Sequence, residues 1–168
     1  MRTGIFITLA ALALAVVAVP DADAHGHAGP DLNQRLSGSS FDNDPDEDTG
    51  HITGWQNLIA KGQPGRAHVD GQFELGLFTP NADCPAQFPL GGDIIRFNWV
   101  ETYNDGSLLT GSATAGLVCA DGLGGSTTVV SGNITGGTGR FEGASGTWEA
   151  EALIANNGLT GSVTADFD

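Results

Sequence analysis

Basic residues are scarce in this sequence. The 168 residues include six Lys and Arg against twenty Asp and Glu, which gives a formal net charge of −14. A field of this sign repels the phosphate backbone of nucleic acids. The composition therefore excludes a nucleic-acid-binding protein.

Long hydrophobic runs are missing after Val19. The only such run, Ile5–Val19, follows Arg2 and precedes the small-x-small site Ala22-Asp23-Ala24, which is the pattern of a cleaved secretory signal. We therefore expect residues 1–24 to be a signal peptide and the mature chain to begin at His25. The protein is expected to be secreted, extracellular or periplasmic, without membrane attachment after cleavage.

Cysteine is also rare, since only Cys84 and Cys119 occur. An isolated cysteine pair in an exported chain is typical of a disulfide, because exported proteins fold in an oxidising compartment. No histidine lies near either cysteine in the sequence to indicate thiol catalysis. We predict a disulfide between Cys84 and Cys119.

Helical periodicity with capping residues is absent after the signal. Residues 25–50 are polar, acidic and rich in Gly, Ser and Asp, and we expect a flexible leader with at most a short strand over residues 32–37. From His51 onward, turn signals recur between segments of alternating apolar and polar residues. The sequence predicts an all-β domain over residues 51–168, a single antiparallel barrel of about eight strands: seven from Ile52 onward, and the eighth near the start.

Strand faces and turns follow from the alternation. In the segment over residues 94–103, one predicted apolar face holds Ile95, Phe97, Trp99 and Tyr103. The turn Asn104-Asp105-Gly106 then predicts a tight hairpin. Trp148 begins a second predicted apolar face, which continues with Ala150, Ala152 and Ile154.

The run from Ile134 to Trp148 contains five glycines. A phosphate-binding loop would lead into a helix, but the residues after Gly146 alternate as a strand does. Glycines beside strands suit turns, bulges and barrel corners. We expect a folding element in which Gly137 or Gly139 has positive φ and Phe141 closes one end of the barrel, and the structural residues of this element are Gly136, Gly137, Gly139, Phe141 and Gly143.

The segment Gly136-Gly137-Thr138-Gly139-Arg140-Phe141-Glu142-Gly143-Ala144 resembles the signature of bacterial secreted proteins with an allene oxide cyclase type barrel, which is related in fold to plant dirigent proteins. Gly62–Val69 is similar to an early strand of that group, and Asn104–Leu109 resembles its mid-barrel hairpin. The resemblance covers about residues 50–168 and implies a β-barrel in this part of the chain.

The same resemblance implies little about activity. Plant members include a cyclase of an unstable fatty-acid epoxide and dirigent proteins that orient the coupling of phenol radicals. Dirigent proteins have an arginine after the motif's alanine, where this chain has Ser145. No catalytic residue is therefore carried over, and we expect no cofactor.

Polar residues within the predicted strands are the candidates for ligand contact. They could contact a ligand if their side chains point into the barrel. These residues are His68, Arg96, Asn98, Glu101 and Tyr103. Glu149 and Glu151 alternate with apolar residues, so we expect both carboxylates to face water.

His25 and His27 carry an independent hypothesis. Cleavage after Ala24 would expose the sequence His-Gly-His, whose amine, amides and imidazoles suit square-planar Cu(II) or Ni(II). A polar leader that happens to contain two histidines is the simpler interpretation.

Two interpretations of function remain for the barrel. The first is a secreted, non-enzymatic protein that binds a small apolar or phenolic ligand or has an extracellular structural role. The second is a cyclase or isomerase that acts on a reactive lipid or phenolic substrate inside the barrel. The contents of the barrel interior distinguish them, because a roomy cavity favours binding and a perturbed titratable group in it favours catalysis.

Overall fold

The computed structural model describes residues 32–156 and 158–168. This part of the chain contains nine strands and one short 3-10 helix, η1. In chain order the elements are β1 (Leu32–Asp42), β2 (Ile52–Gln63), β3 (Gly65–Leu75), β4 (Thr79–Pro80), β5 (Leu90–Tyr103), β6 (Leu108–Ala120), β7 (Ser126–Gly137), η1 (Gly139–Phe141), β8 (Gly146–Ala155) and β9 (Gly158–Phe167).

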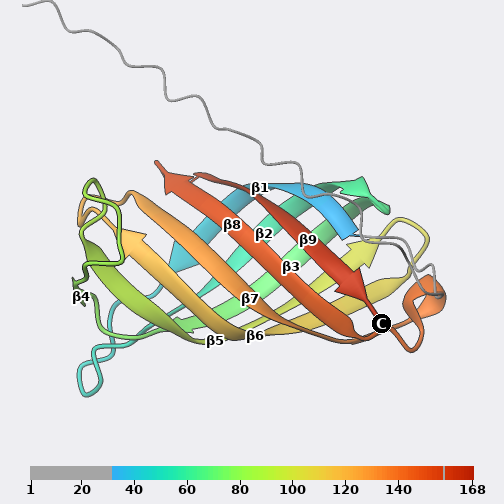
Figure 1. Cartoon of the computed structure of the whole chain (residues 1–168), viewed down its shortest axis with the longest axis horizontal. Coiled ribbons are helices and arrows are strands. Elements are labelled where there is room, and N and C mark those ends of the chain that lie inside the picture. Colours follow the sequence, from blue (N-terminus) through green and yellow to red (C-terminus); the bar gives the residue numbers. More distant parts are fainter. Residues whose placement is uncertain (1–31, 157) are drawn as a thin grey trace, which may run out of the picture.

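The strands form a closed antiparallel barrel (Figure 1). Neighbouring strands follow the order β3-β2-β1-β9-β8-β7-β6-β5, and β3 pairs with β5 to complete the ring. The two-residue strand β4 lies outside the ring and pairs with the start of β5. The predicted fold class is therefore confirmed, since closure leaves the eight long strands without an open sheet edge.

Strand β1 corrects the expected start of the ordered domain. The sequence predicted a flexible leader over residues 25–50, but Leu32–Asp42 is an eleven-residue strand that pairs with β2 and β9 along its length. Its polar, glycine-containing composition resembles a linker, yet Leu32 and Gln34 are buried inside the barrel. The barrel therefore begins at Leu32 instead of His51.

A β-bulge in β5 corrects one predicted strand face. Glu74 pairs with Arg96 and Leu75 pairs with Ile94, so Ile95 is the extra residue. Ile94 therefore packs with the interior, whereas Ile95 is half exposed. Strict alternation, which takes no account of an inserted residue, had placed Ile95 on the inner face.

The predicted hairpin turn at Asn104-Asp105-Gly106 is confirmed. The amide of Gly106 donates to the carbonyl of Tyr103, and β6 begins at Leu108. A second hairpin joins Ala155 of β8 to Gly158 of β9. Tight connections of this kind fix the register of the strands that they join.

One end of the barrel is filled by side chains. The chain between β7 and β8 turns through η1 and places Phe141 in the core, where it is 3% exposed. Its ring centroid lies 4.9 Å from that of Tyr103 and 6.5 Å from that of Phe167. Leu32 and Leu109 belong to the same buried cluster. This end, which contains Phe141, is called the closed end below.

The predicted disulfide between Cys84 and Cys119 is present, with Cα atoms 5.6 Å apart. It joins the segment between β4 and β5 to the last residues of β6. The bond therefore holds this segment against the end of the barrel opposite Phe141.

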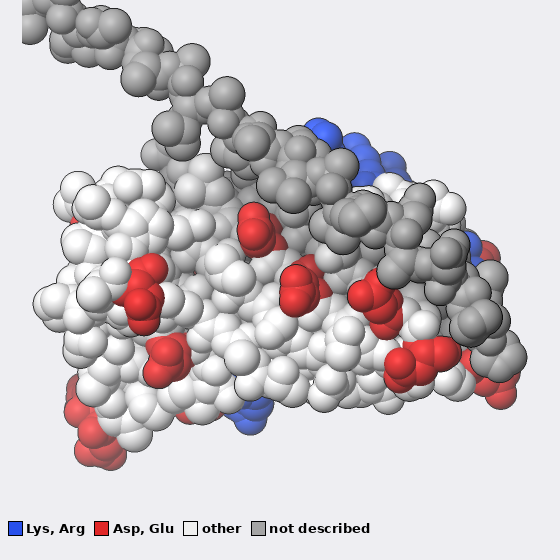
Figure 2. Space-filling view, viewed as in Figure 1, with Lys and Arg blue, Asp and Glu red and all other residues white. Residues whose placement is uncertain are grey.

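Most of the charged residues are acidic, and they are scattered over a largely uncharged surface (Figure 2). Figure 2 shows Asp and Glu side chains spread over one face, with Lys and Arg side chains near its edges. Within residues 32–156 and 158–168, no helix is long and apolar enough to cross a membrane.

Candidate functional site: a cavity inside the barrel

A cavity of about 700 Å³ occupies the barrel from its middle to the end opposite Phe141. Inward-facing side chains of most strands line it, and most of them are aliphatic or aromatic. The principal apolar contributors are Leu58, Phe73, Phe97, Trp99, Trp148 and Ile154. The predicted apolar face of β8 is therefore part of the cavity wall, because Ala150 and Ala152 also line it.

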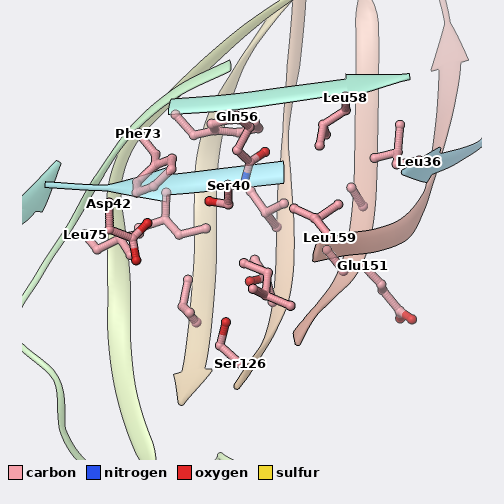
Figure 3. Close-up of a pocket in the computed structure, with 18 of the residues that line it drawn as sticks. Leu36, Ser40, Asp42, Gln56, Leu58, Phe73, Leu75, Ser126, Glu151 and Leu159 are labelled. Atoms are coloured by element: carbon pink, nitrogen blue, oxygen red, sulfur yellow. The ribbon is translucent and has the colours of Figure 1, made fainter. Parts of the chain in front are cut away.

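The rim of the cavity combines apolar and polar groups. Figure 3 places Asp42 beside Leu75, and Ser40 beside Gln56. Asp42 remains exposed at the end of β1, yet desolvation by its surroundings raises the pKa of its carboxyl. Glycines of the segment between β6 and β7, such as Gly124, complete the rim.

Among the described residues, Glu101 provides the one buried ionisable side chain in the cavity wall. Its side chain is 2% exposed, and its Oε2 accepts a hydrogen bond from the hydroxyl of Tyr103. The Tyr103 hydroxyl also accepts a hydrogen bond from Nε2 of Gln34 at 3.1 Å. These three side chains form a buried polar cluster between the cavity and the closed end.

Burial dominates the electrostatics of this cluster. Desolvation raises the pKa of Glu101 above its ordinary value, and the hydrogen bond from Tyr103 offsets part of this increase. Desolvation and then the neighbouring Glu101 carboxyl raise the pKa of Tyr103, so its hydroxyl stays protonated and acts as a donor. A buried carboxyl with a raised pKa can act as a proton donor or bind a cation.

Gln34 is a site residue that the sequence interpretation missed. It lies within the segment predicted to be a leader and is 1% exposed. Its Oε1 is buried and has no hydrogen-bond partner among the described residues. The available signal was its spacing, because Gln34 lies between Leu32 and Leu36 at the period of an inward strand face.

The five predicted ligand contacts divide between the two faces of the barrel. Glu101 and Tyr103 point inward, as described above. His68 lies on the outer face with Asn57 and Asp70, and Arg96 forms an ion pair of 3.3 Å with Glu74 while 63% of its side chain is exposed. Asn98 is also exposed. His68, Arg96 and Asn98 occupy the alternate positions of their strands and do not line the cavity.

The two carboxylates of β8 lie on the outer face. Glu149 and Glu151 are exposed, as alternation predicted. Glu151 contributes to the wall at the cavity rim, but Figure 3 shows its side chain extending away from the other labelled residues.

The glycine motif lies at the closed end, away from the cavity. Gly139 has a φ of 62°, and a Cβ there would lie 2.5 Å from Oγ of Ser107. Gly137 has no positive φ, but a Cβ there would lie 2.6 Å from the carbonyl oxygen of Leu108. Gly136 and Gly143 also have positive φ, at 143° and 77°. The motif therefore shapes the turn that carries Phe141.

The candidate metal ligands His25 and His27 lie outside the described residues, as does the predicted signal peptide. Within the part of the chain from Leu32 onward, Asn157 excepted, no group of three or more His, Cys, Asp or Glu side chains is arranged to hold a metal ion. The copper or nickel hypothesis stays a prediction.

Comparison of the chain with protein-family models, with curated proteins and with solved structures gives no match. The functional argument therefore depends on the cavity and its polar cluster.

Proposed function

We propose that this protein is a secreted β-barrel that binds a small apolar or phenolic molecule in the cavity. The observation that carries the proposal is the cavity of about 700 Å³, lined mainly by apolar side chains with Glu101 in its wall. Binding sites for small molecules combine an apolar wall with a few polar groups that fix orientation. A barrel with a purely structural role would gain stability from filling this space, as it does around Phe141.

Membership of the allene oxide cyclase type is part of the proposal. The closed eight-stranded barrel is compatible with that type, and the glycine motif lies where the chain turns into β8. Secretion is likewise proposed from the signal pattern of residues 1–24, and the Cys84–Cys119 disulfide is compatible with it.

Titration with N-phenyl-1-naphthylamine tests ligand binding. This neutral apolar probe becomes fluorescent on leaving water, so the purified protein should give saturable emission with one probe bound per chain. Ala150→Phe places a ring in the cavity and should weaken binding by about tenfold or more. Glu149→Phe adds the same ring to the outer face of β8 and should leave binding unchanged.

The absence of saturable binding to the unmodified protein would overturn the proposal. An equal loss of binding in both variants would also overturn it, because Glu149 lies outside the cavity. Thermal unfolding of both variants checks that each remains folded.

A cyclase or isomerase is the second candidate function, favoured by the raised pKa of Glu101 in the cavity wall. A protonated carboxyl in an apolar cavity could act as a general acid toward a reactive epoxide. The test compares cyclised and hydrolysed products of an unsaturated fatty-acid epoxide with and without the protein. Catalysis requires a product ratio that the protein changes and Glu101→Gln restores to that of buffer.

A further inference from the structure

The charged residues in the cavity wall are all acidic. Asp42, Glu101 and Glu151 belong to the wall, and no Lys, Arg or His of the described chain does. Glu101 is the only one of the three that is buried. Because the Glu151 side chain extends away from the cavity, the acidic groups closest to its interior are Asp42 at the rim and Glu101 in the buried part of the wall.

The Glu101 carboxyl has no cationic partner among the described residues. Arg140 lies over the Tyr103 ring, with its guanidinium carbon 4.4 Å from the ring centroid. Arg140 also pairs with Asp105 at 3.5 Å, outside the barrel interior. Burying a carboxylate without a counter-charge is unfavourable, and a bound cation would relieve that cost.

Aromatic rings surround this part of the cavity. Trp99 precedes Glu101 by two residues on the same face of β5, which corresponds to about 7 Å along the strand. The Trp148 ring centroid lies 5.7 Å from that of Trp99 and 6.0 Å from that of Phe97. Aromatic faces attract cations, most strongly where water is excluded.

From this combination we infer that the occupant of the cavity is an apolar amine, with its ammonium group at Glu101 and its hydrophobic body among the aromatic rings. The inference rests on the proposed function and narrows its ligand class. The ammonium would pair with the carboxyl while Tyr103 continues to donate to Oε2. Neutral and anionic molecules of the same shape would fill the same space without this ion pair.

Competition with bound N-phenyl-1-naphthylamine tests the inference on the unmodified protein. Three competitors share one ring system and differ in charge: 1-naphthylmethylamine, 1-naphthylmethanol and 1-naphthoate. The amine should displace the probe at a concentration about tenfold lower than the alcohol, and the carboxylate should be the weakest. Equal displacement by the amine and the alcohol would overturn the inference.

The variant Glu101→Gln tests whether the preference for the amine originates at Glu101. It removes the charge and keeps an oxygen that can accept from Tyr103, so the amine should lose its advantage while the alcohol binds as before. Glu149→Gln is the matched control, because it removes one carboxyl from the outer face and changes the net charge equally. If both variants reduce the amine's advantage by the same factor, the preference comes from the overall acidity of the protein, and the inference is wrong.

The outcomes distinguish this inference from the proposed function. If the neutral probe does not bind at all, the proposed cavity function fails. If the probe binds and the three competitors do not differ as predicted, only the amine assignment fails. Equal displacement by the amine and the alcohol on the unmodified protein overturns the inference whether or not Glu101→Gln folds.

Discussion

The hydroxyl of Tyr103 donates a hydrogen bond to Oε2 of Glu101, and both side chains are buried in the barrel. The pair marks the boundary between two halves of the interior. On one side Phe141 and its neighbours fill the barrel, and on the other the cavity extends toward Asp42. The Glu101 carboxyl therefore lies between the packed part of the interior and the cavity.

Glu101 makes stability depend on pH. Because burial raises its pKa in the folded state, its favourable contribution is fully present below the unfolded pKa and is lost as pH rises through the folded pKa. Relative to Glu101→Gln, the unmodified protein should therefore be most stable below the ordinary pKa of a glutamate and should lose that advantage as pH rises above it. Urea unfolding of both proteins across this range measures the difference.

Glu149→Gln controls for the loss of one carboxyl. The lowered pKa values of Asp46, Asp105 and Asp121, which accept backbone hydrogen bonds in exposed turns, affect all three proteins alike. They therefore cancel in the comparison. If the stability advantage of the unmodified protein over Glu101→Gln grows with rising pH, the pKa of Glu101 is not raised and the prediction is wrong.

The disulfide should stabilise the fold by restricting the unfolded chain. Cys84 and Cys119 are separated by 35 residues, and closing a loop of that length is worth about 3 to 4 kcal/mol in the chain-entropy model. The double variant Cys84→Ser, Cys119→Ser should lose about this much unfolding free energy, measured by denaturant titration under non-reducing conditions. An unchanged transition midpoint would show that the bond adds nothing.

Trp99 is 7% exposed and lies against the backbone of Gly111, where an added Cβ would be 2.4 Å from the indole. Removing a buried Trp costs about 3 to 5 kcal/mol. Because Trp99 also borders the cavity, we expect Trp99→Ala to be near the low end, about 3 kcal/mol. Calorimetric unfolding tests this value. A variant as stable as the unmodified protein would show that Trp99 does not contribute to the core.

Substitutions at Gly139 and Gly143 distinguish two ways in which the glycine motif affects stability, namely backbone conformation and close packing. Both have positive φ, but an added Cβ meets Ser107 at Gly139 and nothing within 4 Å at Gly143. Gly143→Ala should cost only the backbone term, about 1 to 2 kcal/mol, and Gly139→Ala should cost more. Neither variant should change the affinity for N-phenyl-1-naphthylamine, because the motif lies at the closed end. Loss of probe affinity without loss of stability would make the motif a recognition site.

Local sequence chemistry predicted much of the barrel. The hairpin at Asn104-Asp105-Gly106 depends on a turn type that a few residues determine, and the inner face beginning at Trp148 depends on simple alternation. Both were predicted correctly. The disulfide was also predicted, because two cysteines allow one pairing.

Features that depend on distant pairing were not predicted. Strand β1 is stabilised by its pairing with β2 and β9, and its own composition favours a linker. The bulge at Ile95 becomes visible only when β3 and β5 are aligned. For the same reason the sequence could nominate Glu101 and Tyr103 but could not place Gln34 beside them, since 69 positions separate Gln34 from Tyr103.

A crystal structure of the protein soaked with N-phenyl-1-naphthylamine tests the central claim most directly. Density for the probe should lie inside the barrel, between Phe73 and Trp148, with Phe141 still closing the opposite end. The exposed stacked pair Phe41 and Trp55, of which Phe41 also belongs to the cavity wall, is the competing apolar surface. Density only at that pair, with the cavity left unoccupied, would contradict the account.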